Sequence, residues 1–271
     1  TRLQGDWSSD VCSSDLKIAK TWSFVVVADP HLREDDPYVI PNGAEGLTAL
    51  EKFRRVLQRS EQLQPPPQFM MLLGDLHVDK FEKVIPEIPL PFHVVIGNHE
   101  KLADRQKLRE LFKDDFQERD FYSFEQNDTL FICLCDSVPG DHVGHFESQN
   151  ITPNVGQLAW LEEQLQHGQQ YAHCIVFGHV SPSPDGQPHQ DHLTHNDANW
   201  LRDCVQQYQP SALFFGHRHQ HIWFDIAGTP VYSLRSCNWN FDADEPPVFL
   251  HVTVSPEGVD VQFINTIENI E

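Results

Sequence analysis

The stretch Phe24-Val25-Val26-Val27-Ala28-Asp29-Pro30-His31 joins an apolar run directly to an aspartate and a histidine. A run of aromatic and β-branched residues without polar alternation indicates a strand that is buried on both faces. Asp29 and His31 then stand at the carboxyl end of this strand, where layered α/β folds build their sites. The stretch therefore predicts a buried strand that ends in two candidate metal ligands.

Apolar runs followed by a short polar block recur along the chain. The later blocks are Gly74-Asp75, Gly97-Asn98-His99-Glu100, Gly178-His179 and Gly216-His217-Arg218-His219. A single pair of this kind often marks only a turn. Because every block follows a strand-like run, their series predicts that residues from distant parts of the chain meet in one cluster.

The blocks supply carboxylate, amide and imidazole groups. The predicted metal ligands are Asp29, His31, Asp75, Asn98, His179, His217 and His219. The two oxygens of Asp75 can bridge two ions that lie about 3.5–4 Å apart. Mixed oxygen and nitrogen donors suit Mn, Fe, Zn or Co better than Mg or Ca. We therefore predict two divalent or trivalent metal ions side by side.

Composition narrows the class of protein. The chain has 271 residues, of which 39% are hydrophobic and 22% charged, and its formal net charge is −21. A long nucleic-acid footprint would need a basic face, so this charge favours small substrates over polymers. No apolar run approaches the length that spans a membrane. The cysteines lack a Cys-x-x-Cys spacing, which favours buried free thiols and a reducing, cytoplasmic location. The oligomeric state is left open.

The first residues differ from the rest. Ser8-Ser9-Asp10 is repeated as Ser13-Ser14-Asp15 without apolar periodicity. We interpret residues 1–16 as a non-native tail that resembles translated sequencing-adapter sequence, the alternative being a disordered native tail. We expect the native N-terminus to be missing and residues 17–271 to form a single domain.

Strand-like and helix-like segments alternate from Trp22 to Phe215, and four strand-like segments follow between His221 and Phe263. We expect these last strands to form a meander. The pattern predicts an α/β (α+β) fold, a four-layer α/β/β/α sandwich of two mixed sheets flanked by helices.

The blocks read D-x-H, G-D, G-N-H-[DE], G-H and G-H-x-H, and in this order they resemble the calcineurin-like metallophosphoesterase superfamily. Gly156-Gln157-Leu158-Ala159-Trp160-Leu161 is most similar to its cyclic-nucleotide phosphodiesterase-type and purple-acid-phosphatase-like branches. The resemblance implies one metal bound by Asp29, His31, Asp75 and His219. It implies a second metal bound by Asp75, Asn98, His179 and His217. His99 corresponds to the catalytic histidine, and the candidates for substrate binding are Asn98, His99 and Arg218.

Two positions depart from the pattern of these relatives. Val78 stands where purple acid phosphatases carry a tyrosine ligand, so we expect no iron–tyrosinate bond. Many members carry an acidic residue or asparagine at the same position, so the residue that supports His99 from behind is left open. The histidines without a counterpart are interpreted as packing or surface residues: His77, His93, His142, His145, His167, His173 and His221.

The resemblance implies attack of metal-activated hydroxide on a small phosphodiester, with cyclic nucleotides among the candidate substrates. The alternatives are a phosphomonoesterase or protein phosphatase of the same fold, or a metal-binding scaffold without turnover. We expect a scaffold to have lost His99 or several ligands. The loops Asp136–Pro153 and Ser181–His192 are predicted to overhang the site and to set its selectivity.

Overall fold

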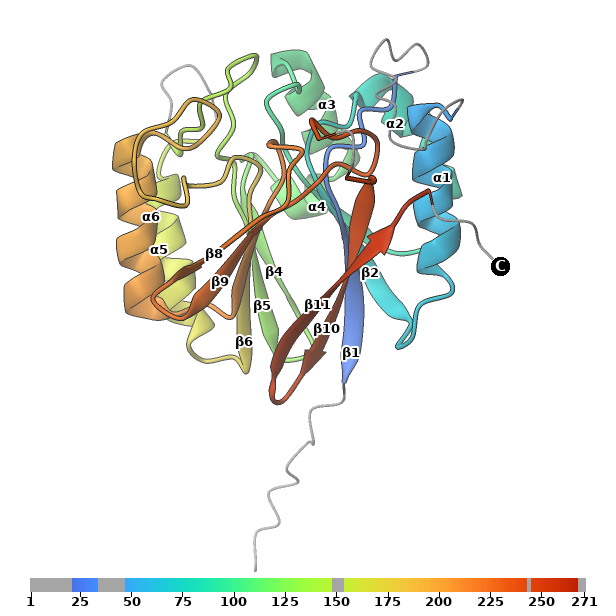
Figure 1. The fold of residues 1–271 in the computed structure, drawn as a ribbon. Coiled ribbons are helices and arrows are strands. Elements are labelled where there is room, and N and C mark those ends of the chain that lie inside the picture. The colour runs from blue at the N-terminus through green and yellow to red at the C-terminus, as the bar shows by residue number, and fades with distance from the viewer. Residues whose placement is uncertain (1–20, 34–46, 148–153, 243–244, 268–271) are drawn as a thin grey trace, which may run out of the picture.

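The computed structural model describes residues 21–33, 47–147, 154–242 and 245–267, so the predictions for residues 1–16 lie outside the described residues. Two mixed β-sheets lie face to face between outer layers of helices (Figure 1). This arrangement confirms the predicted sandwich of two mixed sheets.

The first sheet has the strand order β11-β10-β1-β2-β3. Its strands are β1 (Trp22–Val27), β2 (Pro67–Leu73), β3 (Phe92–Val95), β10 (Val248–Ser255) and β11 (Gly258–Asn265). The first three run parallel, whereas β10 is antiparallel to both β1 and β11. Helices α1 (Ala49–Ser60) and α2 (Val78–Val84) lie on its outer side (Figure 1). A 3₁₀ turn (Ile85–Glu87) follows α2, and α3 (Leu102–Leu111) and α4 (Lys113–Phe116) lead to the second sheet.

The second sheet has the order β4-β5-β6-β7-β9-β8. Its strands are β4 (Tyr122–Gln126), β5 (Thr129–Cys133), β6 (His173–Phe177), β7 (Ala212–Phe215), β8 (Ile222–Ile226) and β9 (Thr229–Ser233). The central strands run parallel, and β4 and β8 are antiparallel edges. Helices α5 (Gln157–Gly168) and α6 (His195–Tyr208) cover its outer face (Figure 1).

Aromatic rings fill the space between the sheets. Phe24 of β1 stacks on Phe69 of β2 at 4.9 Å, and its ring lies 5.6 Å from Phe131 and 6.0 Å from Phe177 of the second sheet. All four side chains are buried. Because each buried phenylalanine contributes about 1.5–3 kcal/mol, this cluster fixes the two sheets against each other.

The predicted C-terminal meander is wrong. The strands exist, but the β8–β9 hairpin extends the second sheet and the β10–β11 hairpin extends the first. Alternation of side chains indicates a strand without identifying its partner, which tertiary packing decides. Cys237 lies between the two hairpins in the sequence, and its amide donates to the Ala28 carbonyl at 3.0 Å, next to the first ligand block.

The five cysteines in the described residues are free and buried, as predicted. Cys12 lies outside the described residues. Among the helices of the described part, none is long and apolar enough to cross a membrane.

Candidate dimetal centre

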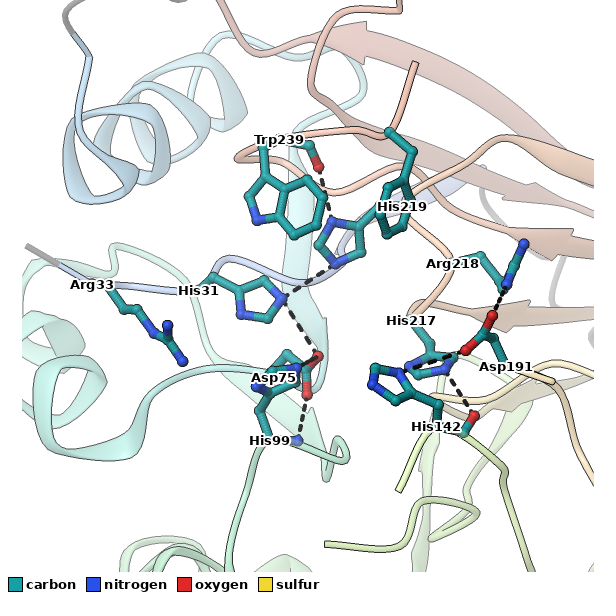
Figure 2. A pocket seen from close by; sticks show the side chains of 11 residues that line it. His31, Arg33, Asp75, His99, His142, Asp191, His217, Arg218, His219 and Trp239 are labelled. Carbon is teal, nitrogen blue, oxygen red and sulfur yellow. Dashed lines mark hydrogen bonds and ion pairs between the residues drawn. The ribbon is translucent and has the colours of Figure 1, made fainter. Parts of the chain in front are cut away.

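The predicted ligands lie together beyond the carboxyl ends of the parallel strands. Figure 2 shows His31, Asp75, His217 and His219 among them. One group, with ligand atoms within 4.8 Å of one another, contains Asp29, His31, Asp75 and His219. A second group contains Asp75, His179 and His217, and the Oδ1 of Asn98 lies 3.1 Å from a ring nitrogen of both histidines. Asp75 belongs to both groups, which is the position expected of a bridging carboxylate.

The turns that carry these side chains have an unusual backbone conformation. Positive φ angles occur at Asp29 (51°), His31 (41°), Asp75 (57°), His217 (68°) and His219 (48°). A non-glycine residue in this region costs about 1–3 kcal/mol, and it persists where surrounding contacts determine the conformation. Concentration of such residues at the strand ends marks a site where side-chain direction matters more than local stability.

Hydrogen bonds to carbonyl groups fix the ring orientation of three histidines. His179 Nδ1 donates to the Leu73 carbonyl at 2.6 Å, and His219 Nδ1 donates to the Trp239 carbonyl at 3.0 Å. His217 Nε2 donates to the His142 carbonyl at 3.1 Å. Because a carbonyl only accepts, each of these ring nitrogens carries the hydrogen. In the neutral ring, the opposite nitrogen then presents a lone pair to the centre, as a metal-binding imidazole requires.

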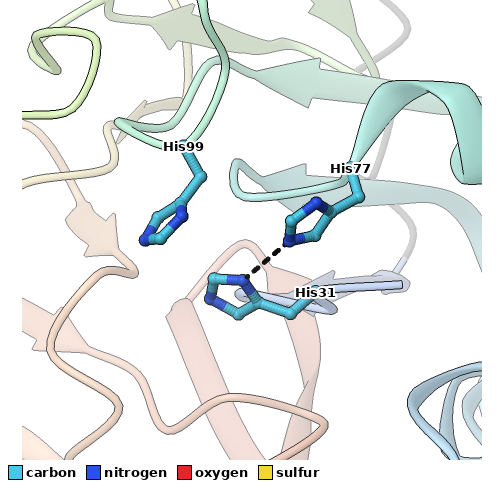
Figure 3. A group of neighbouring side chains, drawn as sticks. All are labelled: His31, His77 and His99. Carbon is cyan, nitrogen blue, oxygen red and sulfur yellow. Dashed lines mark hydrogen bonds between the residues drawn. The ribbon is translucent and has the colours of Figure 1, made fainter. Parts of the chain in front are cut away.

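His31 also carries its ring hydrogen on the nitrogen that faces away from the centre. Its Nδ1 faces His77 Nε2 at 3.5 Å, and that nitrogen already accepts from Arg33 Nε at 2.9 Å (Figure 3). The hydrogen between the rings therefore belongs to His31, whose Nε2 lone pair points toward His219 Nε2 at 3.2 Å. Burial lowers the pKa of His31 and favours its neutral, metal-binding form.

With the four rings in the neutral form that binds metal, the inward-facing atoms are all acceptors. His31 Nε2 then meets His219 Nε2, and Asn98 Oδ1 meets two ring nitrogens, with no hydrogen between them. Carboxylate oxygens of Asp29 and Asp75 add negative charge. Buried acceptors in mutual contact are stabilised by cations. The residues therefore fit two metal ions.

Both carboxylates are also oriented by backbone amides. Asp29 accepts from the His217 amide at 3.0 and 3.1 Å, and Asp75 Oδ1 accepts from the His99 amide at 3.0 Å. Such close approach leaves no room for a side chain at Gly97. A Cβ added there would lie 2.2 Å from Asp75 Oδ1 and 2.5 Å from the Asp75 amide nitrogen.

We expect Gly97→Ala to displace Asp75 and to lower the metal content, with a loss of about 1–3 kcal/mol of folding stability through overpacking. Metal analysis and thermal denaturation measure the two effects. Gly228→Ala is the control, because its Cβ would meet no atom within 4 Å and adds only local strain at a φ of 96°. If Gly97→Ala retained full metal content, the contact would have no role in placing Asp75.

Two buried carboxylates behind the ligands were not assigned a role from the sequence. Glu100 accepts from the amides of Asp75, Leu76 and Gly97 at 2.7–2.9 Å, and burial raises its pKa to about 7. Asp136 accepts from the His179 amide at 2.9 Å, and burial raises its pKa to about 6. Asp136 follows β5 as Asp29 follows β1, so an aspartate after a strand was the available signal.

Two buried basic side chains on helices donate hydrogen bonds to the loops that form the site. Arg105 of α3 donates to the carbonyls of Glu100 and Gly97 at 3.0 and 3.1 Å. Lys52 of α1 donates to the Asn238 carbonyl at 2.8 Å, next to the residue whose carbonyl orients His219. Nothing in the sequence distinguishes these cations from the solvated lysines and arginines of other helices.

A pocket of about 400 Å³ opens over the ligands (Figure 2). His99 faces it with 40% of its side chain exposed, and its Nε2 lies 3.9 Å from Asp75 Oδ2. Trp239 and Phe241 form an aromatic wall beside His219, with their rings 4.1 and 5.9 Å from the imidazole. His99 therefore has access both to the centre and to a bound molecule.

The other wall comes from the two predicted loops and Arg218. Gly144 pairs with Leu193, so the described parts of the loops lie side by side. They contribute His142 and Asp191 to the pocket, and Arg218 binds Asp191 Oδ2 at 2.8 Å. Two of the histidines that the sequence placed among packing or surface residues lie at the site: His142 lines the pocket, and His77 contacts His31. Neither has a spacing that would have identified it.

The sequence profile of the calcineurin-like phosphoesterase family matches residues 23–221, and the chain belongs to this family. Serine/threonine-protein phosphatase CPPED1 from Danio rerio is 27% identical over 232 residues, covering 74% of this chain and 72% of the relative. The chain is a metal-dependent phosphoric ester hydrolase, and its family implies a dimetal centre.

Solved structures share the fold. A dimetal phosphatase from Danio rerio aligns with a TM-score of 0.61 and 15% identity, over 90% of this chain and 99% of that one. GAP50, the anchor in the inner membrane complex of Plasmodium, aligns with a TM-score of 0.61 and 12% identity, over 91% and 85% of the two chains. At these identities the likeness concerns the fold alone.

Proposed function

We propose that this protein hydrolyses phosphomonoesters and that its substrates are phosphorylated hydroxyl side chains of proteins. The observation that carries the reaction is the position of His99, exposed to the pocket and 3.9 Å from the carboxylate shared by both ligand groups. The name of the relative from Danio rerio supports the substrate class. Arg33 and Arg218 line the pocket and favour the two negative charges of a monoester over the single charge of a diester.

Metal ions bound to these ligands would polarise the phosphoryl oxygens and lower the pKa of a coordinated water. The protein's own groups have separate tasks. Asp75 joins the two ligand groups and also fixes the loop of His99 through the amide hydrogen bond. Asn98 contacts both histidines of the second group. From the open side, His99 donates a proton to the departing alkoxide oxygen. The four buried histidines keep their ring orientation throughout, because their outer nitrogens stay bonded.

The alternative is hydrolysis of a phosphodiester, as predicted from the sequence. A panel of esters distinguishes a monoesterase from a diesterase. With Mn present, we expect kcat/KM for 4-nitrophenyl phosphate to exceed that for bis(4-nitrophenyl) phosphate by at least about tenfold, which corresponds to 1.4 kcal/mol. Phosphoserine peptides should also be hydrolysed, and cyclic nucleotides should not. Protein stripped with a chelator provides the blank.

Other results of the ester panel would indicate a phosphodiesterase or a metal-binding scaffold. Faster hydrolysis of the diester or of a cyclic nucleotide would contradict the monoesterase proposal. A protein that binds metal and turns over no ester would be a scaffold. The complete set of buried acceptors and the exposed His99 support the enzyme instead.

A further inference from the structure

Two further hollows adjoin the central pocket. The first, of about 450 Å³, shares Arg33 and His99 with the pocket. The second, of about 500 Å³, shares Asp191 and Arg218 with it. Figure 2 shows Arg33 on one side of Asp75 and Asp191 and Arg218 on the other, with His99 next to Asp75. The three hollows are therefore neighbours, and we call them together the groove, with the candidate metal centre at its central pocket.

The two ends of the groove come from different parts of the fold. One end, the α2 arm, is lined by His77, Asp79 and Lys80 at the start of α2 and by Asp104 of α3. The other end, the loop arm, is lined by Pro184, Asp185, His189 and Gln190 of the loop before α6. The arms add space beyond the central pocket, and only a longer molecule can occupy the pocket and an arm together.

We infer that the phosphorylated residue is presented on an extended polypeptide, with its neighbours on one side in the α2 arm and on the other side in the loop arm. This inference rests on the proposed function and specifies the form of its substrate. An extended chain advances about 3.3 Å per residue, so a few residues on each side reach into the arms. The arms then add binding energy that a free phosphoamino acid cannot obtain.

The exposed carboxylates of the two arms favour a polypeptide over a nucleic acid. Asp79 is 85% exposed in the α2 arm, and Asp185 is 56% exposed in the loop arm. A nucleic-acid strand in the groove would place its phosphates beside these carboxylates, in a protein whose formal net charge is −21. A polypeptide backbone is neutral, and its N–H groups can donate to the same carboxylates.

A peptide series tests the groove. We expect kcat/KM for a peptide with about four residues on each side of phosphoserine to exceed that for free phosphoserine by at least about tenfold. Peptides extended on one side only should fall between the two. Fluorescence anisotropy of a labelled phosphopeptide measures binding independently of turnover. A labelled single-stranded oligonucleotide of similar length is the competing ligand and should bind more weakly.

Bulky side chains should close each arm without reaching the metal centre. Asp79→Trp blocks the α2 arm, and Gln190→Trp blocks the loop arm; both positions are exposed. We expect each to lower peptide kcat/KM and affinity by about tenfold while leaving 4-nitrophenyl phosphate turnover unchanged. The matched control is Glu257→Trp, an exposed position in the β10–β11 turn at the far end of the sheet (Figure 1).

The outcomes separate this inference from the proposed function. Equal kcat/KM for phosphoserine and for the long peptide would overturn the groove while the monoesterase stands. Tighter binding of the oligonucleotide would also overturn it. If no ester were hydrolysed, the proposed function would fail, and anisotropy with the two tryptophan variants would still decide whether the arms bind the peptide.

Discussion

Asp75→Ala should lose metal from both ligand groups and reduce turnover to the level of the blank, the largest effect that we expect from any single substitution. Only Asp75 belongs to both groups: its Oδ2 lies 3.4 Å from His31 Nε2 and its Oδ1 lies 3.5 Å from His179 Nε2. Removing it also takes one negative charge from a buried site that would hold two cations. Metal analysis of purified protein and the ester panel measure the result.

Asp79→Ala is the matched control for this prediction. It lies four positions further along the chain, is 85% exposed and forms only a surface ion pair with Lys107 at 3.0 Å. Surface pairs contribute about 0–1 kcal/mol, so metal content and hydrolysis of 4-nitrophenyl phosphate should remain normal. Circular dichroism checks that the Asp75 variant is folded. Two metal ions per folded Asp75→Ala chain would refute the bridging role.

His99→Ala should keep both metals and lose turnover, because His99 faces the pocket without belonging to either group of predicted ligands. We expect kcat to fall by about 10²–10⁴-fold for an alkyl phosphate, the usual contribution of general acid catalysis. A nitrophenolate leaves readily without a proton, so the defect should be much smaller for 4-nitrophenyl phosphate. The ratio of the two defects therefore reports proton donation.

His142→Ala is the control on the opposite wall of the pocket. The substitution removes an exposed ring but keeps the main-chain carbonyl that accepts from His217 Nε2. It should retain the metals and show the same modest change for both esters. If His99→Ala lowered both rates equally, His99 would orient the phosphate and would not be the acid.

Local signals explain how much of the site could be predicted from the sequence. A strand, a tight turn and a metal ligand are neighbours in the chain, so Asp29 or His179 can be recognised from the residues beside it. Asp136 carries the same signal, yet it acts by accepting from the His179 amide and has no counterpart in the five blocks. Its role depends on β5 lying beside β6, which only the folded sheet reveals.

Pairing between distant segments explains what could not be predicted. The strand-like character of residues 221–263 was evident, but the choice between one meander and two hairpins depends on which sheet offers an open edge. Lys52 and Arg105 contact carbonyls far away in the sequence or behind the loop, and no periodicity encodes such a target. His77 and His142 likewise derive their importance from what the fold places next to them.

The sheet order also determines when the centre can form during synthesis. Asp29 and His217 are 188 positions apart, and β1 has its second neighbour only when β10 has been made. A growing chain therefore carries Asp29, His31 and Asp75 beside an unpaired strand edge while their partners are still missing. Contacts of such sequence separation slow folding and leave that edge open to pairing with other chains. The predicted ligand set is thus complete only in a nearly finished polypeptide, and β1 keeps an open edge until β10 has been made.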